Sequence, residues 1–149
     1  MLVLAASLPD LDGMGLLWSV DAYQEAHHVW GHNLAAALLL SILLSLVSDH
    51  RRLCFPLCIA LFHLHLLMDF HGSGQGWGIA YWWPLSGQYC YTDHAWSLGG
   101  WQNYAALGIL AAWTWLILRL KNRTLFEHMA PPVDRAFLNV FGTPQGQEL

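Results

Sequence analysis

The chain has 149 residues, of which 56% are hydrophobic and only 11% charged, and nine of them are tryptophan. It is long enough to bury a core of its own, but this composition is too apolar for an ordinary soluble domain and favours a membrane protein. The net charge is −4, and no basic residue precedes Arg51, so the basic surface of a nucleic-acid-binding protein is absent. The three cysteines have no zinc-ribbon spacing, and their odd number argues against a disulfide framework.

The first residues predict the end of a short helix followed by a turn. Residues 1–8 are apolar but too few to cross a bilayer, and they lack the basic start of a signal peptide. Pro9 ends this helix, and Asp10 and Asp12 follow in a turn that continues into Gly13. Two carboxylates at this spacing can face one cation, as in many metal-binding loops; the alternative is an ordinary solvated turn.

Three histidines lie just before the first long apolar segment. Asp21 is a candidate N-cap of a helix that precedes them. His28 and His32 are one helical turn apart, and His27 is five residues from His32, so either pair could chelate a metal ion, depending on where the next helix begins. A single histidine here would be structural in most proteins, whereas three within six residues favour metal binding.

Two apolar segments predict an antiparallel pair of helices. Residues 34–47, together with the residues from Val29 onward, give about 20 residues of helix, roughly the thickness of one bilayer core. A short polar turn at residues 49–52 leads into a second apolar helix at residues 53–70. Because the turn is short, the two helices should lie side by side and run in opposite directions.

This hairpin predicts which distant residues meet. With the turn centred near residue 50, His32 should lie level with Asp69, and His65 should lie about one turn deeper. His65 and Asp69 are four residues apart and therefore share one face of the second helix. We expect imidazoles and carboxylates from separate parts of the chain to converge at one end of the hairpin.

A long aromatic segment, residues 71–102, separates the hairpin from a third apolar helix at residues 105–120. A loop of this length is usually functional, and its Trp and Tyr content favours a cap over the site at the membrane–water interface, or an anchor belt without a catalytic role. Short helical pieces are expected around residues 134–141. We therefore predict an all-α integral membrane protein with about three transmembrane helices, divided into a membrane-embedded domain at residues 1–123 and a short polar cytoplasmic tail at residues 124–149.

The basic residues predict the orientation in the membrane. All six lie either in the turn at residues 49–52 or after residue 118. With three spans these two regions fall on one side, which the positive-inside rule makes cytoplasmic. The histidines and carboxylates then face the periplasm or exterior of an inner membrane. Without Lys or Arg nearby, such a cluster would repel itself unless it bound a cation.

The residue types indicate which metal and which chemistry. Carboxylates and imidazoles suit zinc, with manganese and iron as alternatives, and their number allows one or two ions. Without thiolates, the set is typical of a catalytic rather than a structural zinc site, where a metal-bound water attacks the substrate. Asp69 is then a candidate catalytic residue as well as a ligand, and Asp93 and His94 are candidate general acids or bases.

Four motifs occur in order along more than half of the chain: LPDLD at residues 8–12, HHVWGHN at 27–33, HLLMD at 65–69 and YWWPLS at 81–86. In these motifs the chain resembles the YdjM family of inner-membrane proteins, which are predicted metal-dependent hydrolases. The resemblance implies a helical membrane protein whose functional set is Asp10, Asp12, His27, His32, His65 and Asp69. The family pattern His-Arg-Gly-x-Thr-His-Ser has lost its Arg and Thr here, so His28 either joins or replaces His27 as a ligand.

The leading hypothesis is a membrane-bound metal-dependent hydrolase that cleaves an ester or phosphoester of a lipid or lipid-linked molecule. Its expected partners are membrane lipid and a small-molecule or lipid substrate, without nucleic acid and with the oligomeric state left open. The alternatives are a non-enzymatic metal-binding or transport-associated membrane protein and a purely structural His/Asp network. His63 points away from His65 on a helix and is expected to be a core histidine with a backbone hydrogen bond, or a supporting partner of the site.

Overall fold

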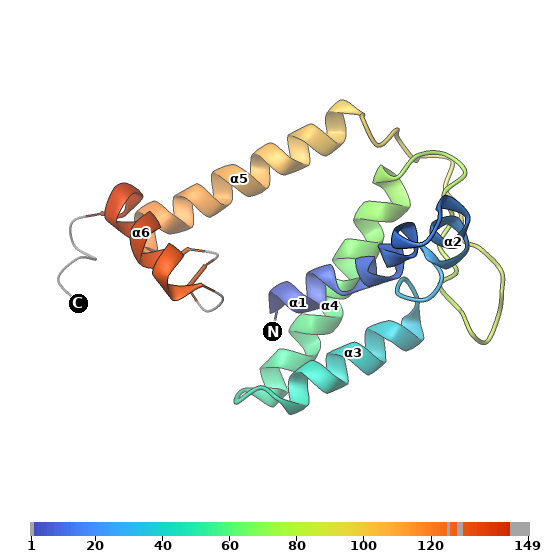
Figure 1. Cartoon of the computed structure of the whole chain (residues 1–149), viewed down its shortest axis with the longest axis horizontal. Coiled ribbons are helices and arrows are strands. Elements are labelled where there is room, and N and C mark those ends of the chain that lie inside the picture. Colours follow the sequence, from blue (N-terminus) through green and yellow to red (C-terminus); the bar gives the residue numbers. More distant parts are fainter. Residues whose placement is uncertain (1, 125, 128–129, 144–149) are drawn as a thin grey trace. The chain divides into compact units, whose positions relative to one another are not determined.

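The computed structural model describes residues 2–124, 126–127 and 130–143. Seven helices and no strand occur in these ranges (Figure 1), which confirms the all-α prediction: α1 (Leu2–Ser7), the 3-10 helix η1 (Pro9–Leu17), α2 (Val20–Ala26), α3 (Leu34–Leu46), α4 (Arg51–Gly72), α5 (Trp101–Lys121) and α6 (Pro131–Phe141). The chain divides into two compact units, Met1–Leu98 and Gly99–Leu149. The boundary predicted between residues 123 and 124 stays a prediction.

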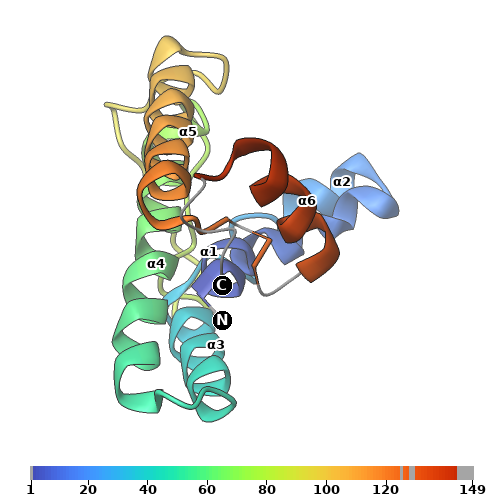
Figure 2. The same cartoon turned by 90° about the vertical axis from the view of Figure 1, so that its left-hand side faces the viewer.

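The first unit is built on the predicted helical hairpin. α3 and α4 lie side by side and run antiparallel, as both views show (Figure 1, Figure 2), and α1 packs against α4. Two buried apolar clusters hold these helices together. The first cluster joins α1 to the turn end of the hairpin through Ala5, Leu44, Cys54 and Cys58. The second joins the open end of the hairpin to the loop after α4 through Ala37, Phe62, Leu66 and Ile79.

The first hairpin helix is shorter than expected because of a polar cap. The Asn33 side chain accepts a hydrogen bond from the N–H of Ala36 at 2.7 Å, and its amide group donates to the carbonyls of Val29 and Trp30. The expectation that the helix begins near Val29 is therefore wrong. α3 has 13 residues, and a helix of that length covers only about 20 Å, less than a bilayer core.

A second N-cap also differs from expectation. The side chain of Ser19, not that of Asp21, caps α2 by accepting the N–H of Ala22 at 2.9 Å. Asp21 lies instead in the first turn of the helix, where a negative charge is favourable beside the positive end of the helix dipole.

Among the described residues, α4 and α5 are the two helices long and apolar enough to cross a membrane. With 22 and 21 residues, each covers about 30 Å, the thickness of a bilayer core. Only 22% and 6% of their most apolar stretches are buried within the protein. Apolar surface of this extent, unburied by protein, suits contact with lipid.

The second unit contains α5 and α6. Asn122 ends α5 in a left-handed conformation, and its side chain bonds Thr143 beyond α6. Arg119 donates to the carbonyl of Phe141 at 3.0 Å. The helical piece expected around residues 134–141 is present as α6.

Candidate metal centre

Two carboxylates and two imidazoles converge at the end of the hairpin. The Nε2 atoms of His32 and His65 are 3.2 Å apart, and each lies 3.0 Å from Oδ2 of Asp69. Asp10 Oδ1 lies 3.3 Å from the same nitrogen of His65 and 3.8 Å from that of His32. One atom from each of the four side chains lies within 4.8 Å of the others, so this cluster could hold a metal ion.

The helices place these groups as the hairpin register predicts. His65 and Asp69 project from one face of α4, one turn apart, and His32 lies directly before α3 at the same end of the pair. Asp69 is 18 residues from Arg51, which puts it about 27 Å along α4 from the basic turn. The predicted convergence is confirmed, and within the first unit the cluster lies at the end of the hairpin remote from the arginines.

Asp12 holds the far side of the His32 ring. The side chain of Asp12 is 2% exposed, and its carboxylate accepts hydrogen bonds from His32 Nδ1 at 2.9 Å, His27 Nδ1 at 2.8 Å and the backbone N–H of Gly31 at 2.9 Å. An ionised carboxylate only accepts, so the nitrogens that face it carry protons. When His32 is neutral, as a metal ligand must be, its proton stays on Nδ1 and the lone pair of Nε2 points at the cluster, as in the carboxylate–histidine pairs that orient metal ligands.

The same contacts shift the pKa values of both groups. Burial by itself would raise the pKa of Asp12, but the hydrogen bonds from His27, His32 and Gly31 outweigh it and hold this pKa well below its usual range. Burial by itself would lower the pKa of His32, but Asp12 and Asp69 accept hydrogen bonds from the ring and raise it. Asp12 thus stays ionised across the physiological range, and a positive charge is favourable at His32.

The four converging atoms fit a small divalent cation. Zinc bound at 2.0–2.2 Å by four ligands in a tetrahedron keeps those ligands about 3.3 Å apart. Five of the six separations between the four atoms are 3.0 to 3.8 Å, and the sixth, from Asp10 to Asp69, is within 4.8 Å. The His32 side chain is completely buried, whereas that of Asp10 is 59% exposed. The cluster therefore has an anchored inner side and an open outer side, where a water or a substrate could approach.

His27 and His28 lie beside this cluster. One ring nitrogen from each of His27, His28 and His32 lies within 4.8 Å of the others, which makes a second group that could hold a metal ion. The His27 ring stacks on Tyr23, with centroids 4.6 Å apart. His28 is buried, and burial together with the neighbouring His32 and His27 rings lowers its pKa to about 4. His28 is thus a neutral imidazole near neutral pH.

The loop after α4 covers the histidines. The N–H of Ala80 donates to the carbonyl of His28 at 3.0 Å, and the N–H of Leu34 donates to the carbonyl of Tyr81 at 3.0 Å. The ring of Trp77 lies edge-on to that of His28, with centroids 5.7 Å apart. This loop was expected to cap the site, and these contacts bring it onto the segment that carries the histidines.

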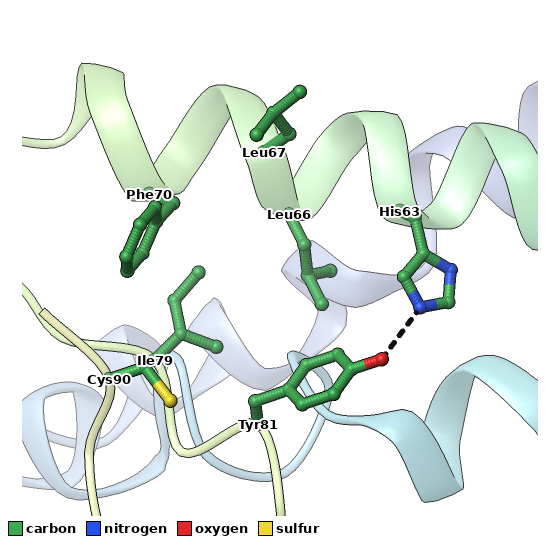
Figure 3. Close-up of a pocket in the computed structure, with 7 residues that line it drawn as sticks. All are labelled: His63, Leu66, Leu67, Phe70, Ile79, Tyr81 and Cys90. Carbon is green, nitrogen blue, oxygen red and sulfur yellow. Dashed lines mark hydrogen bonds between the residues drawn. The ribbon is translucent and has the colours of Figure 1, made fainter. Parts of the chain in front are cut away.

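His63 lies outside the cluster. Its Nδ1 donates to the carbonyl of Ile59 at 2.9 Å, as expected for a core histidine, and the hydroxyl of Tyr81 lies 3.0 Å from its Nε2. Figure 3 shows this pair at one end of a mostly apolar pocket of about 220 Å³, which Leu66, Phe70 and residues of the loop line on a neighbouring face of α4.

Of the predicted site residues, Asp93 and His94 are not brought into the cluster. Both are exposed in the loop, where the N–H of His94 donates to Thr92 Oγ1 at 3.2 Å. Neither belongs to the two groups of potential metal ligands found among the described residues. Gly31, whose N–H donates to Asp12, was not among the predicted residues, because no pattern in the sequence marks a glycine for that role.

Comparisons of this chain with protein-family models, with curated proteins and with solved structures give no match.

Proposed function

We propose that the protein is a membrane-bound metal-dependent hydrolase, with Asp10, His32, His65 and Asp69 as the ligands of a zinc ion. The observation that carries this proposal is the convergence of these four side chains, with Asp12 holding the other ring nitrogen of His32. Manganese or iron is the alternative metal, since both accept the same donors. The motif resemblance to the YdjM family supports the same function.

When bound, the ion would supply a water of lowered pKa as the nucleophile and polarise the carbonyl or phosphoryl oxygen of the substrate. The chain's own residues orient these groups. Asp12 fixes the tautomer and the direction of the His32 ring. Asp10 lies on the exposed side of the cluster, and we propose that it accepts a proton from an incoming water. Asp93 and His94 stay candidate acids or bases on the covering loop.

The position of the cluster supports a lipid or lipid-linked ester or phosphoester as the substrate. Asp69 lies three residues before the end of α4, so in a membrane-spanning α4 the cluster would lie at headgroup level. Exposed Trp30 and Trp82 lie in the neighbouring segments, and tryptophan favours that depth. The apolar pocket on the adjacent face of α4 is suited to an alkyl chain. We propose an inner-membrane protein whose cluster faces the periplasm or exterior.

The short α3 bears on the number of spans. α4 and α5 satisfy the length requirement, whereas α3 would cross only with the help of the turns at its ends. We propose α3 as a third span, because its sequence is apolar apart from two serines. The spans α4 and α5 bring the basic residues of the turn at residues 49–52 and those after residue 118 to one side, in accord with the positive-inside rule.

The test is hydrolysis of ester and phosphoester substrates by the purified full chain in lipid nanodiscs, before and after metal removal. We expect activity that a chelator abolishes and zinc restores. His65→Ala should lose activity and the zinc ion bound by these four ligands, whereas His50→Ala, which alters an exposed histidine at the opposite end of α4, should keep both. Activity indifferent to the chelator and to His65→Ala would refute the proposal.

The alternative is a metal-binding or transport-associated protein without enzymatic activity. The histidines and the aspartate of α4 argue for a fixed site, because His63, His65, Asp69 and His71 all lie in its second half and do not continue through the first half. Zinc uptake into vesicles that contain the protein, without hydrolysis of any tested ester, would favour transport.

A further inference from the structure

His28 has a conformation that its local surroundings do not explain. Its backbone φ is +66°, in the left-handed region that non-glycine residues seldom adopt. Its side chain is carried into the interior, where the residue is only 2% exposed. Its Nδ1 is buried and has no hydrogen-bond partner among the described residues. Backbone strain and an unsatisfied buried nitrogen both cost free energy, and outliers of this kind gather at functional sites.

The side chains next to His28 are histidines, which are common metal ligands. Its ring centroid lies 4.4 Å from that of His27 and 4.7 Å from that of His32. Asp12 contacts one member of this group directly, because its Oδ1 lies 2.8 Å from Nδ1 of His27. The second oxygen of Asp12 faces His32. One carboxylate therefore stands between the cluster described above and the pair of adjacent histidines.

The structure holds both rings of this pair from outside. The carbonyl of His28 accepts from Ala80, and Trp77 lies edge-on to the His28 ring. Tyr23 stacks on the His27 ring at 4.6 Å. The His28 ring contacts the rings of Trp77, His27 and His32, and we expect it to keep this orientation, so a partner for its unsatisfied nitrogen must come to the site.

We propose that His27, His28 and Asp12 form a second divalent-cation site beside the first, so that the protein carries a two-ion centre. This inference rests on the proposed function, since it adds an ion to the same site. The cation would replace the proton between Nδ1 of His27 and Oδ1 of Asp12, and His28 would coordinate it through Nδ1, which has no hydrogen-bond partner among the described residues. Two imidazoles and a carboxylate leave a tetrahedral position open, as in catalytic zinc sites.

A cavity gives access to this second site. His27 lines a cavity of about 280 Å³, together with Trp77, Tyr89 and Tyr91 from the covering loop. A substrate that entered there would reach the second ion while its ester group lay toward the first. In two-ion hydrolases one ion activates the attacking water and the other stabilises the leaving oxygen, and this role fits a phosphoester better than a carboxylic ester.

The experiment counts ions. The full chain in nanodiscs is loaded with zinc, passed through a desalting column and analysed for zinc and protein by elemental analysis. We expect two zinc ions per wild-type chain and one per His28→Gly chain. Glycine removes the imidazole and adopts positive φ without strain, so this variant should keep the fold. Free imidazole, added in excess to fill the space left by the ring, should restore the second ion.

Two matched variants assign the ions. His50→Gly removes an exposed histidine outside both groups of potential ligands and should keep two ions. His65→Ala should keep the ion bound at His27 and His28 while losing the first. If His28→Gly does not fold, His28→Asn replaces it, because asparagine also tolerates positive φ and is a poor zinc ligand.

The outcomes separate this inference from the proposed function. One ion per wild-type chain, lost with His65→Ala, would overturn the second site and leave the proposed function standing. Two ions in the His28→Gly chain would also overturn it, because His28 would then not be a ligand. A wild-type chain without zinc would overturn both proposals.

Discussion

The substitution Asp12→Asn tests whether the buried carboxylate orients the metal ligand. Asparagine has the same shape, but one of its two terminal atoms is an NH₂ donor. In the structure both terminal atoms of Asp12 accept hydrogen bonds, one from His27 Nδ1 and the other from His32 Nδ1 and the N–H of Gly31. Whichever way the amide turns, one imidazole N–H then faces another N–H.

The loss of zinc affinity depends on which of the two histidine rings, His32 or His27, loses its hydrogen bond to residue 12. If the proton of His32 moves from Nδ1 to Nε2, the lone pair that faces Asp69 and His65 is lost. If the amide turns the other way, His27 is disturbed and His32 keeps a weaker, neutral acceptor. Loss of a partner of this kind costs about 10–100-fold in metal affinity, or about 1.4–2.7 kcal/mol.

The assay is competition for zinc between the protein and a chromophoric chelator of known affinity. The relevant zinc-binding step is the one that His65→Ala abolishes. Asp21→Asn is the matched control, since it removes an exposed carboxylate in the first turn of α2. We expect the control to bind zinc like the wild type. An Asp12→Asn chain with unchanged affinity for this ion would show that Asp12 does not orient His32, and the reasoning would fail.

Three further predictions follow from the same geometry. Gly31→Ala would push a methyl group into the carbonyl oxygen of Pro9 and to 3.1 Å from Oδ2 of Asp12, so it should lower the free energy of unfolding by about 1–3 kcal/mol and weaken zinc binding. The control Gly87→Ala, with open space around it, should change neither quantity in thermal melts and zinc titrations. Equal effects of the two substitutions would contradict the packing argument. The raised pKa of His32 means that its contribution to the stability of the metal-free protein is present below about pH 6.5 and is lost as pH rises through that pKa, while zinc affinity should rise over the same interval because fewer protons compete. Melting temperatures measured from about pH 6 to 9 should therefore drift in opposite directions with chelator and with zinc, and parallel drifts would contradict the assignment of His32 as a ligand. Zinc at a hundredfold excess over its dissociation constant should stabilise the protein by about 2.7 kcal/mol over the chelated sample, and no shift of the melting temperature would show that the folded chain holds no ion.

The boundaries of the helices were predictable where apolar runs decide them. The second hairpin helix was expected at residues 53–70 and runs from Arg51 to Gly72. The start of α3 was not predictable. The apolar pattern continues back to Val29, but the hydrogen bonds of the Asn33 side chain cap the N-terminus of the helix, so that it begins at Leu34. An N-cap depends on the conformation of one side chain, and the local sequence does not determine whether an asparagine adopts that conformation.

The site was predictable as a set of residue types but not as an arrangement. The hairpin register alone places His32 beside Asp69. Nothing local to the sequence shows that Asp12 binds two imidazoles at once, or that Tyr81 bonds His63 while the loop covers His28. Those contacts join residues 15 to 52 positions apart in the chain, and they depend on how η1 and the loop pack against α4.

By itself the sequence determined an all-helical, apolar chain with imidazoles and carboxylates gathered at one end of a hairpin, because helical periodicity and a short turn leave few other arrangements. The tertiary structure alone decided which nitrogen of His32 faces the cluster, that His28 turns inward with positive φ, and which side of the cluster is open. Those features depend on distances of about 3 Å between segments that meet only after packing, and hydrogen-bond direction at that range is beyond what residue spacing can specify.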